Sequence, residues 1–141
     1  MRLSRHIATD ETGVAAIETA FALPILIVMI WMFVQLAQVY RALAGMQQGL
    51  GEGARYATLC LTPTAAAGCS RPSTDSIKQK INDSVYGIAP GTFTVSDPVL
   101  GTSGTGKYYD LKVAYSQPTT LLLFDAPTVN VSRTKRVWVA G

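Results

Sequence analysis

The longest hydrophobic segment of the chain lies near its N-terminus. Residues 20–34 contain no polar side chain, and the uncharged segment extends from Thr19 to Tyr40. A helix of that length rises about 33 Å, which matches the hydrocarbon thickness of a bilayer at about 30 Å. The alternative is a buried core helix, but the rest of so short a chain could hardly surround it. The pattern therefore predicts a transmembrane helix over residues 14–40.

Beyond the span, apolar side chains recur at steps of three and four residues, which predicts that the helix continues as an amphipathic stem to about Tyr56. The stripe consists of Leu43, Met46, Leu50, Ala54 and Ala57. Within the span, Pro24 removes one backbone hydrogen bond, so we expect a bend near residues 20–21.

Three glycines form a second row on the stem, at Gly45, Gly49 and Gly53. Each costs up to about 1 kcal/mol relative to alanine inside a helix. Their spacing predicts close approach of another backbone, either the chain's own sheet or the helix of a neighbouring subunit. The alternative is a frayed helical linker.

The C-terminal part changes from helical to strand periodicity. Ser73 or Thr74 can cap a helix that ends near Gly87, and its apolar stripe is Ile77, Ile81 and Val85. Alternating patterns over 92–99, 108–116 and 129–139 predict about three antiparallel strands. The fold class is therefore α+β, with a long N-terminal helix, a short second helix and a small sheet. The apolar segment 121–124 is interpreted as buried strand or turn, or else as a patch that contacts a membrane or partner.

Charge and cysteine content indicate how the chain is oriented. The net charge is only +3 with 48% hydrophobic residues, which excludes a highly charged disordered tail. Arg2 and Arg5, with His6 beside them, precede the span, so we expect a cytoplasmic N-terminus and an extracytoplasmic domain over 41–141. Cys60 and Cys69 then lie where disulfides form, and we predict that they pair, the alternative being two separate thiols.

Signals for chemistry are weak. Residues 101–107 read G-x-x-x-x-G-K, but Tyr108 and a strand pattern follow, so we interpret them as a hairpin turn rather than a phosphate-binding loop. The sole histidine, His6, precedes the span, which disfavours catalysis, a metal site or a cofactor. Arg133, Lys135 and Arg136 are interpreted as solvated strand charge rather than a nucleic-acid site.

Glu18 lies two residues before the apolar segment, either at headgroup level or as a pairing group for an amine. A basic leader ending at Gly13, with Glu18 five residues later and a long apolar helix, resembles the class III signal of type IV prepilins. The continuation, with Pro24 in the helix and GARYA over 53–57, resembles the TadE-like proteins of tight adherence (Tad, or Flp) pili.

This resemblance implies that residues 1–13 form a leader that a prepilin peptidase cuts between Gly13 and Val14. It also implies a minor pilin or pseudopilin of the bacterial inner membrane, which acts in pilus biogenesis and adhesion. Its partners would be other pilin subunits and the assembly platform, and Glu18 would neutralise the amine of a neighbouring subunit. The alternatives are an uncleaved membrane anchor of the same secretion platform, or a membrane-anchored binding module unrelated to pili.

Overall fold

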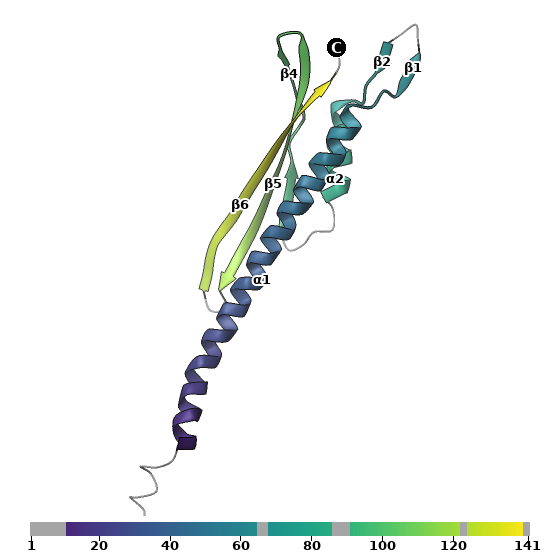
Figure 1. Cartoon of the computed structure of the whole chain (residues 1–141). Helices are drawn as coiled ribbons and strands as arrows, with labels where there is room; N and C mark the ends of the chain where they lie inside the picture. The colour runs from purple at the N-terminus through teal and green to yellow at the C-terminus, as the bar shows by residue number, and fades with distance from the viewer. Residues whose placement is uncertain (1–10, 65–67, 86–90, 122–123, 140–141) are drawn as a thin grey trace, which may run out of the picture.

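The computed structural model describes residues 11–64, 68–85, 91–121 and 124–139 (Figure 1). Within these residues, two helices and six strands form an α+β fold, which confirms the predicted class. The helices are α1 (Glu11–Ala57) and α2 (Thr74–Val85), and the strands are β1 (Thr62–Thr64), β2 (Gly68–Ser70), β3 (Thr92–Val95), β4 (Val99–Ser103), β5 (Gly106–Leu121) and β6 (Phe124–Val139).

The first helix runs without interruption through both the predicted span and the predicted stem. It contains 47 residues and continues past Pro24 to Ala57, one residue beyond the expected end. Because the predicted leader includes residues 11–13, the helix begins inside that leader. The bend near residues 20–21 stays a prediction.

The four-stranded sheet is antiparallel and centred on β5. One edge of β5 pairs with β6, and its other edge pairs with β4 and then with β3. The predicted strand 92–99 is wrong as a single strand, because Pro98 lacks a backbone donor and β3 and β4 lie on either side of it. Residues 101–107 form the β4–β5 hairpin as predicted, with Gly104 at a φ of 58°.

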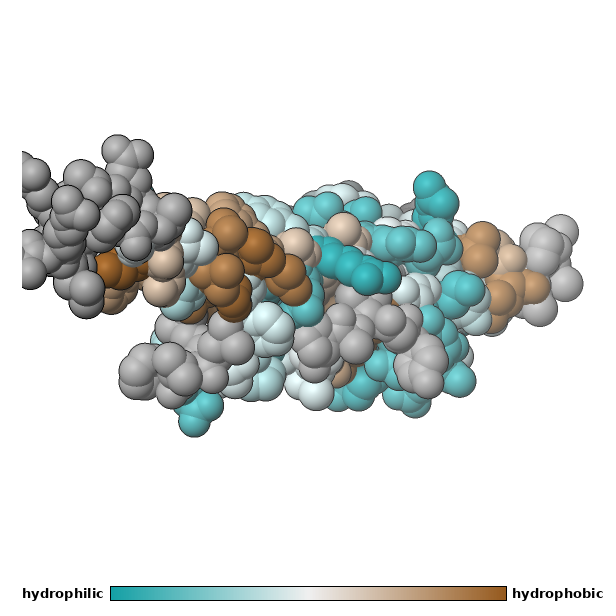
Figure 2. Space-filling view, turned by 90° about the horizontal axis from the view of Figure 1, so that it is seen from below, coloured by the Kyte–Doolittle hydropathy of each residue, from teal (hydrophilic) through white to brown (hydrophobic). Residues whose placement is uncertain are grey.

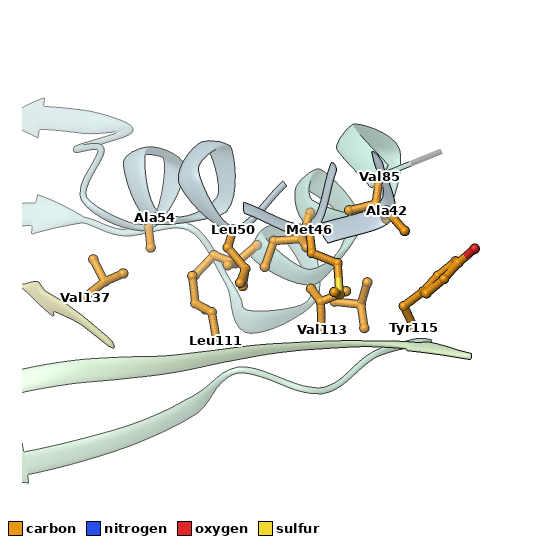
Figure 3. Close-up of a cluster of buried hydrophobic side chains, with 13 residues drawn as sticks. Ala42, Met46, Leu50, Ala54, Val85, Leu111, Val113, Tyr115 and Val137 are labelled. Carbon is orange, nitrogen blue, oxygen red and sulfur yellow. The ribbon is translucent and has the colours of Figure 1, made fainter. Parts of the chain in front are cut away.

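The core lies between α1, α2 and the inner face of the sheet. Figure 3 shows Met46 and Leu50 of α1 lying over Leu111 and Val113 of β5. All three predicted α2 positions are buried, and the α1 stripe is buried except for Leu43, which is partly covered. Ala42 belongs to the same core although the predicted stripe omitted it.

A serine cap begins the second helix. The Ser73 hydroxyl accepts a hydrogen bond from the Ser76 amide at 3.2 Å, and the Ser73 carbonyl accepts one from the Ile77 amide. These bonds satisfy two amide donors of the first turn, so Ser73 rather than Thr74 is the cap. The helix ends at Val85, two residues before the predicted Gly87, and residues 86–90 lie outside the described part.

The cysteine loop is more regular than its composition predicts. Cys60 and Cys69 form a disulfide with their Cα atoms 5.2 Å apart. Inside the loop, β1 and β2 pair as a short antiparallel hairpin. The disulfide therefore closes a small hairpin at the end of the molecule remote from the start of α1 (Figure 1).

The apolar segment 121–124 connects the two longest strands. Leu121 ends β5, Phe124 begins β6, and their Cα atoms are partners. Residues 122–123 and the side chains of Leu121 and Phe124 lie outside the described part of the chain. The prediction that this segment is buried is therefore not tested.

Candidate functional site

The first half of α1 is a bare apolar helix. Every residue from Gly13 to Val34 is exposed, including large side chains such as Phe21 at 73%. Among the described helices, α1 alone is long and apolar enough to cross a membrane. Figure 2 shows the larger group of hydrophobic residues on the left, the side from which α1 starts in Figure 1, and a smaller group at the right. Exposure on all sides excludes the buried core helix and fits a single-pass membrane protein.

The predicted cleavage site lies on the first turns of this helix. An added Cβ at Gly13 would meet no atom within 4 Å, and Val14 is 60% exposed. Glu18 follows Val14 by four residues, so both side chains lie on one face of the helix. Glu18 is exposed, and within the described residues it makes no ion pair. An incoming chain can therefore reach both positions.

Thr19 and Pro24 alter the backbone hydrogen bonding of the bare half of α1. The Thr19 hydroxyl donates to the Ala15 carbonyl at 2.8 Å, which satisfies this hydroxyl without an external partner. Pro24 lies inside the helix and cannot donate to the Ala20 carbonyl. The Ala20 carbonyl therefore lacks its usual amide donor in the helix, and Glu18 has no ion-pair partner among the described residues.

The stem glycines face the second helix. A Cβ added at Gly49 would lie 2.5 Å from Val85 Cγ1, and one at Gly53 would clash with the Ile81 side chain. Gly45 is also buried. The element that approaches Gly49 and Gly53 is therefore α2 of the same chain, whereas the sequence suggested the sheet or another subunit.

The end of the β5–β6 hairpin binds α1 at the upper end of the bare segment. The Thr120 carbonyl accepts a hydrogen bond from Trp31 Nε1 at 2.8 Å and a second from the Gln35 side-chain amide. An apolar groove of about 450 Å³ lies beside this contact, lined by Met29, Met32, Phe33, Gln35, Leu36, Val39, Thr119 and Val129. The folded domain therefore reaches down to Trp31.

One turn higher, a polar network links α1 to the sheet. Gln117 is 1% exposed, and its amide donates to the Gln38 side-chain oxygen at 3.1 Å. The Tyr115 hydroxyl donates to the Gln117 oxygen at 2.8 Å and accepts from the Gly91 amide at 3.0 Å. Each buried polar group of this network has a partner, so it fixes the position of β5 on the helix.

Sequence reasoning missed these contacts because Trp31, Gln35 and Gln38 were counted within the membrane span. A signal was present: the three residues and Ala42 follow one another at steps of four, three and four residues. This spacing places them on one helix face and joins them to the stem stripe.

The outer face of the sheet carries an ion pair. Arg136 donates two hydrogen bonds to the Asp110 carboxylate, both at 2.8 Å, and its guanidinium lies 4.0 Å from the centre of the Tyr108 ring. The hydrogen bond from Arg136 lowers the pKa of Asp110 below its usual value, and the nearby positive charge adds to that effect. Arg136 is therefore paired with Asp110, and its side chain remains half exposed, as the sequence predicted.

A second, polar groove lies between the two helices. Its volume is about 430 Å³, and its lining includes Glu52, Arg55, Lys80 and Asp83. Its ion pair joins Arg55 and Glu52 at 3.5 Å, within one helix. Across the described residues, no group of three or more His, Cys, Asp or Glu side chains could hold a metal ion.

Comparison with known proteins relates the helical region to a pilus family. Residues 13–55 match the family model described as "TadE-like protein", which covers the bare half of α1 and most of the stem but under a third of the chain. No curated protein and no solved structure matches the chain. The match confirms the resemblance drawn from the sequence and relates the chain to Tad pili.

Proposed function

We propose that this chain is a minor pilin or pseudopilin of a Tad-type pilus system. In this proposal the N-terminus is cytoplasmic, α1 inserts in the inner membrane, and a prepilin peptidase removes residues 1–13. The processed subunit then joins other pilin subunits, and the assembly platform, through its N-terminal helix.

The observation that carries the proposal is the division of α1 into a bare apolar half and a half covered by its own domain. The bare half contains the predicted cleavage site and Glu18, and it falls within the matched residues 13–55. A helix that is apolar on every side needs a lipid or protein environment. In a membrane-inserted subunit this helix is surrounded first by lipid and, after assembly, by the helices of neighbouring subunits.

The proposed assembly contact combines helix packing with charge neutralisation. Cleavage after Gly13 would create an α-amino group at Val14, one helical turn from Glu18. Within one chain these groups would interact locally, while in an assembly Glu18 can approach the amine of a neighbour. An unpaired carboxylate in the membrane costs about 2.5–3.5 kcal/mol, so neutralisation favours the assembled state.

The N-terminal residue of the membrane-extracted protein tests processing. Intact mass and terminal peptide sequencing are carried out on cells with and without their prepilin peptidase. We expect a start at Val14 only where the peptidase is present. A start at Met1 or Arg2 in both strains contradicts processing.

Substitution of Glu18 tests the assembly contact separately. Glu18→Ala should retain cleavage but reduce recovery of the chain in sheared pilus fractions. Glu11→Ala is the matched control, because position 11 lies in the segment that cleavage removes. Equal recovery of both variants would refute the neutralisation step.

One observation favours a second candidate, an uncleaved membrane anchor of the secretion platform. The helix already begins at Glu11, so the Gly13–Val14 bond lies within helical backbone. A peptidase would have to unwind this first turn, whereas an anchor would keep it. The same terminal sequencing distinguishes the two candidates.

A further inference from the structure

The end of the β5–β6 hairpin lies beside helix residues that hydropathy assigns to the membrane. Thr120 binds Trp31 and Gln35, and Gln117 binds Gln38 one turn higher. Figure 1 shows this end of the hairpin against α1, well below α2. The segment from Trp31 to Tyr40 is therefore covered on one side by a polar strand.

Hydrocarbon is a poor environment for that strand. Among the described strands, β6 pairs with β5 alone, so its other edge presents backbone donors and acceptors without strand partners. Lipid-exposed sheet edges do not occur in the hydrocarbon region, because no water can satisfy these groups there. Asp125, the Cα partner of Thr120, is also exposed, and an ionised aspartate in the membrane is costly.

We propose that the outer boundary of the hydrocarbon lies at Trp31 rather than at Tyr40, and that the end of the β5–β6 hairpin rests on the lipid headgroups beside it. This inference rests on the membrane insertion in the proposed function. Tryptophan is enriched at this level of membrane proteins because its ring is apolar and its N–H is polar. Here the indole N–H is bound to the Thr120 carbonyl at 2.8 Å.

The length of α1 agrees with this boundary. Twenty residues of helix, about 30 Å, span the hydrocarbon. In the uncleaved chain, which is the form that inserts, twenty residues counted back from Ile30 end at Glu11, where α1 begins. The helix therefore has the required length below Trp31 without using any residue that the sheet covers.

The new boundary changes the depth of Glu18. Moving the outer limit from Tyr40 to Trp31 shifts the helix by nine residues, or about 13 Å. Glu18 then lies about 20 Å below the outer boundary and about 10 Å from the inner one. It is inside the hydrocarbon rather than at headgroup level, so a single inserted chain carries a polar group that only a partner can satisfy.

Fluorescence quenching tests the boundary. The chain has two tryptophans, so Trp138→Phe leaves Trp31 as the sole indole. The full-length variant is inserted in phosphatidylcholine vesicles with bromines either near the glycerol or near the methyl end of the acyl chains. We expect the larger loss of Trp31 emission with the shallow bromines. Equal or larger loss with the deep bromines overturns the inference, because a boundary at Tyr40 places Trp31 near the bilayer centre.

A second probe tests the hairpin contact. Asp125→Cys carries a nitrobenzoxadiazole (NBD) fluorophore while the native cysteines remain in their disulfide, and Thr105→Cys in the β4–β5 turn is the matched control. Headgroup-attached nitroxides should quench the label at position 125 and spare the one at position 105. Equal quenching at both positions, or stronger quenching at 125 by acyl-chain nitroxides, refutes the headgroup contact. A chain absent from the vesicle pellet refutes membrane insertion itself, and this inference with it.

Discussion

The two halves of α1 share one helix and have opposite surroundings. From Val14 to Ile30 large apolar side chains are exposed on every side, whereas from Ala42 to Ala57 one face is buried under α2 and the sheet. The folded domain therefore contacts α1 from Trp31 onward and leaves the preceding residues exposed. The first half must obtain its environment from outside the chain, which in the proposed function is lipid and then neighbouring subunits.

The residue types on the two halves follow from this difference. The bare half has large residues such as Phe21 and Leu26, which fill an apolar environment. The stem instead uses Gly49 and Gly53, because α2 approaches its backbone closely. Small residues at a helix contact allow that approach, whereas on a lipid-facing surface they would offer little apolar area.

Methionine occurs in both halves, and truncating it gives the largest expected contrast. Met46 is completely buried against the sheet, while Met29 is 49% exposed. Met46→Ala should lower the free energy of unfolding of the domain by about 2–5 kcal/mol, because it leaves a cavity. Met29→Ala should change it by less than about 0.5 kcal/mol. Urea unfolding in detergent, followed by circular dichroism, measures both.

An equal loss in the two variants would break the comparison. It would mean that the bare half contributes to the folded domain as much as the stem does. Membrane extraction of Met29→Ala should remain normal, which separates insertion from domain stability.

The border between the two halves is tested at Gln38. Gln38→Leu should lower the free energy of unfolding by about 1–3 kcal/mol, because the buried Gln117 amide loses its acceptor. The exposed Gln47 provides a matched control, and Gln47→Leu should have an effect within about 0.5 kcal/mol. If Gln38 faced lipid instead, leucine would be the more favourable side chain at this position. A higher free energy of unfolding for Gln38→Leu would therefore place the border between the two halves of α1 beyond Gln38, nearer to the stem.

Much of the fold follows from local pattern. The long helix, the stripe of α2, the cysteine pair and the β4–β5 hairpin were all predictable, because each depends on periodicity, spacing or turn chemistry over a few residues. The division between β3 and β4 was also encoded locally, by Pro98, but the alternation of neighbouring residues concealed it.

The position of the sheet on the helix was not predictable in the same way. Hydropathy counts Trp31, Gln35 and Gln38 as the polar end of a membrane span, and nothing local shows that β5 extends far enough to bind them. These contacts join residues more than 75 positions apart, so they depend on tertiary structure. The contact of α2 with Gly49 and Gly53 also depends on tertiary structure. For this reason the sequence suggested the sheet or another subunit as the element that approaches the glycines.

The two faces of the stem provide a smaller contrast. Gly53→Ala should cost about 1–2 kcal/mol, because the clash with Ile81 exceeds the gain in helix propensity. An added Cβ at Gly51 meets nothing within 4 Å, so Gly51→Ala should gain about 0.5–1 kcal/mol. Thermal unfolding of both variants measures the difference. A stabilising Gly53→Ala would show that α2 does not pack this closely.

The smallest expected effect lies farthest from α1, on the outer face of the sheet. Because Arg136 lowers the pKa of Asp110, this pair stabilises the fold above the unfolded-state pKa of about 3.9, and its contribution is lost as pH falls through the lower folded-state pKa. Both side chains are solvated, so the change in stability is slight. Arg136→Gln should raise the pKa of Asp110 toward its usual value, as measured by NMR titration of the carboxylate, whereas Arg133→Gln should leave it unchanged. The pKa of Asp110 should also be the same in detergent and in bilayers, because this face of the sheet points away from α1. A different pKa in bilayers would show that the outer face of the sheet contacts lipid. The contact between the domain and the membrane would then extend beyond the end of the hairpin.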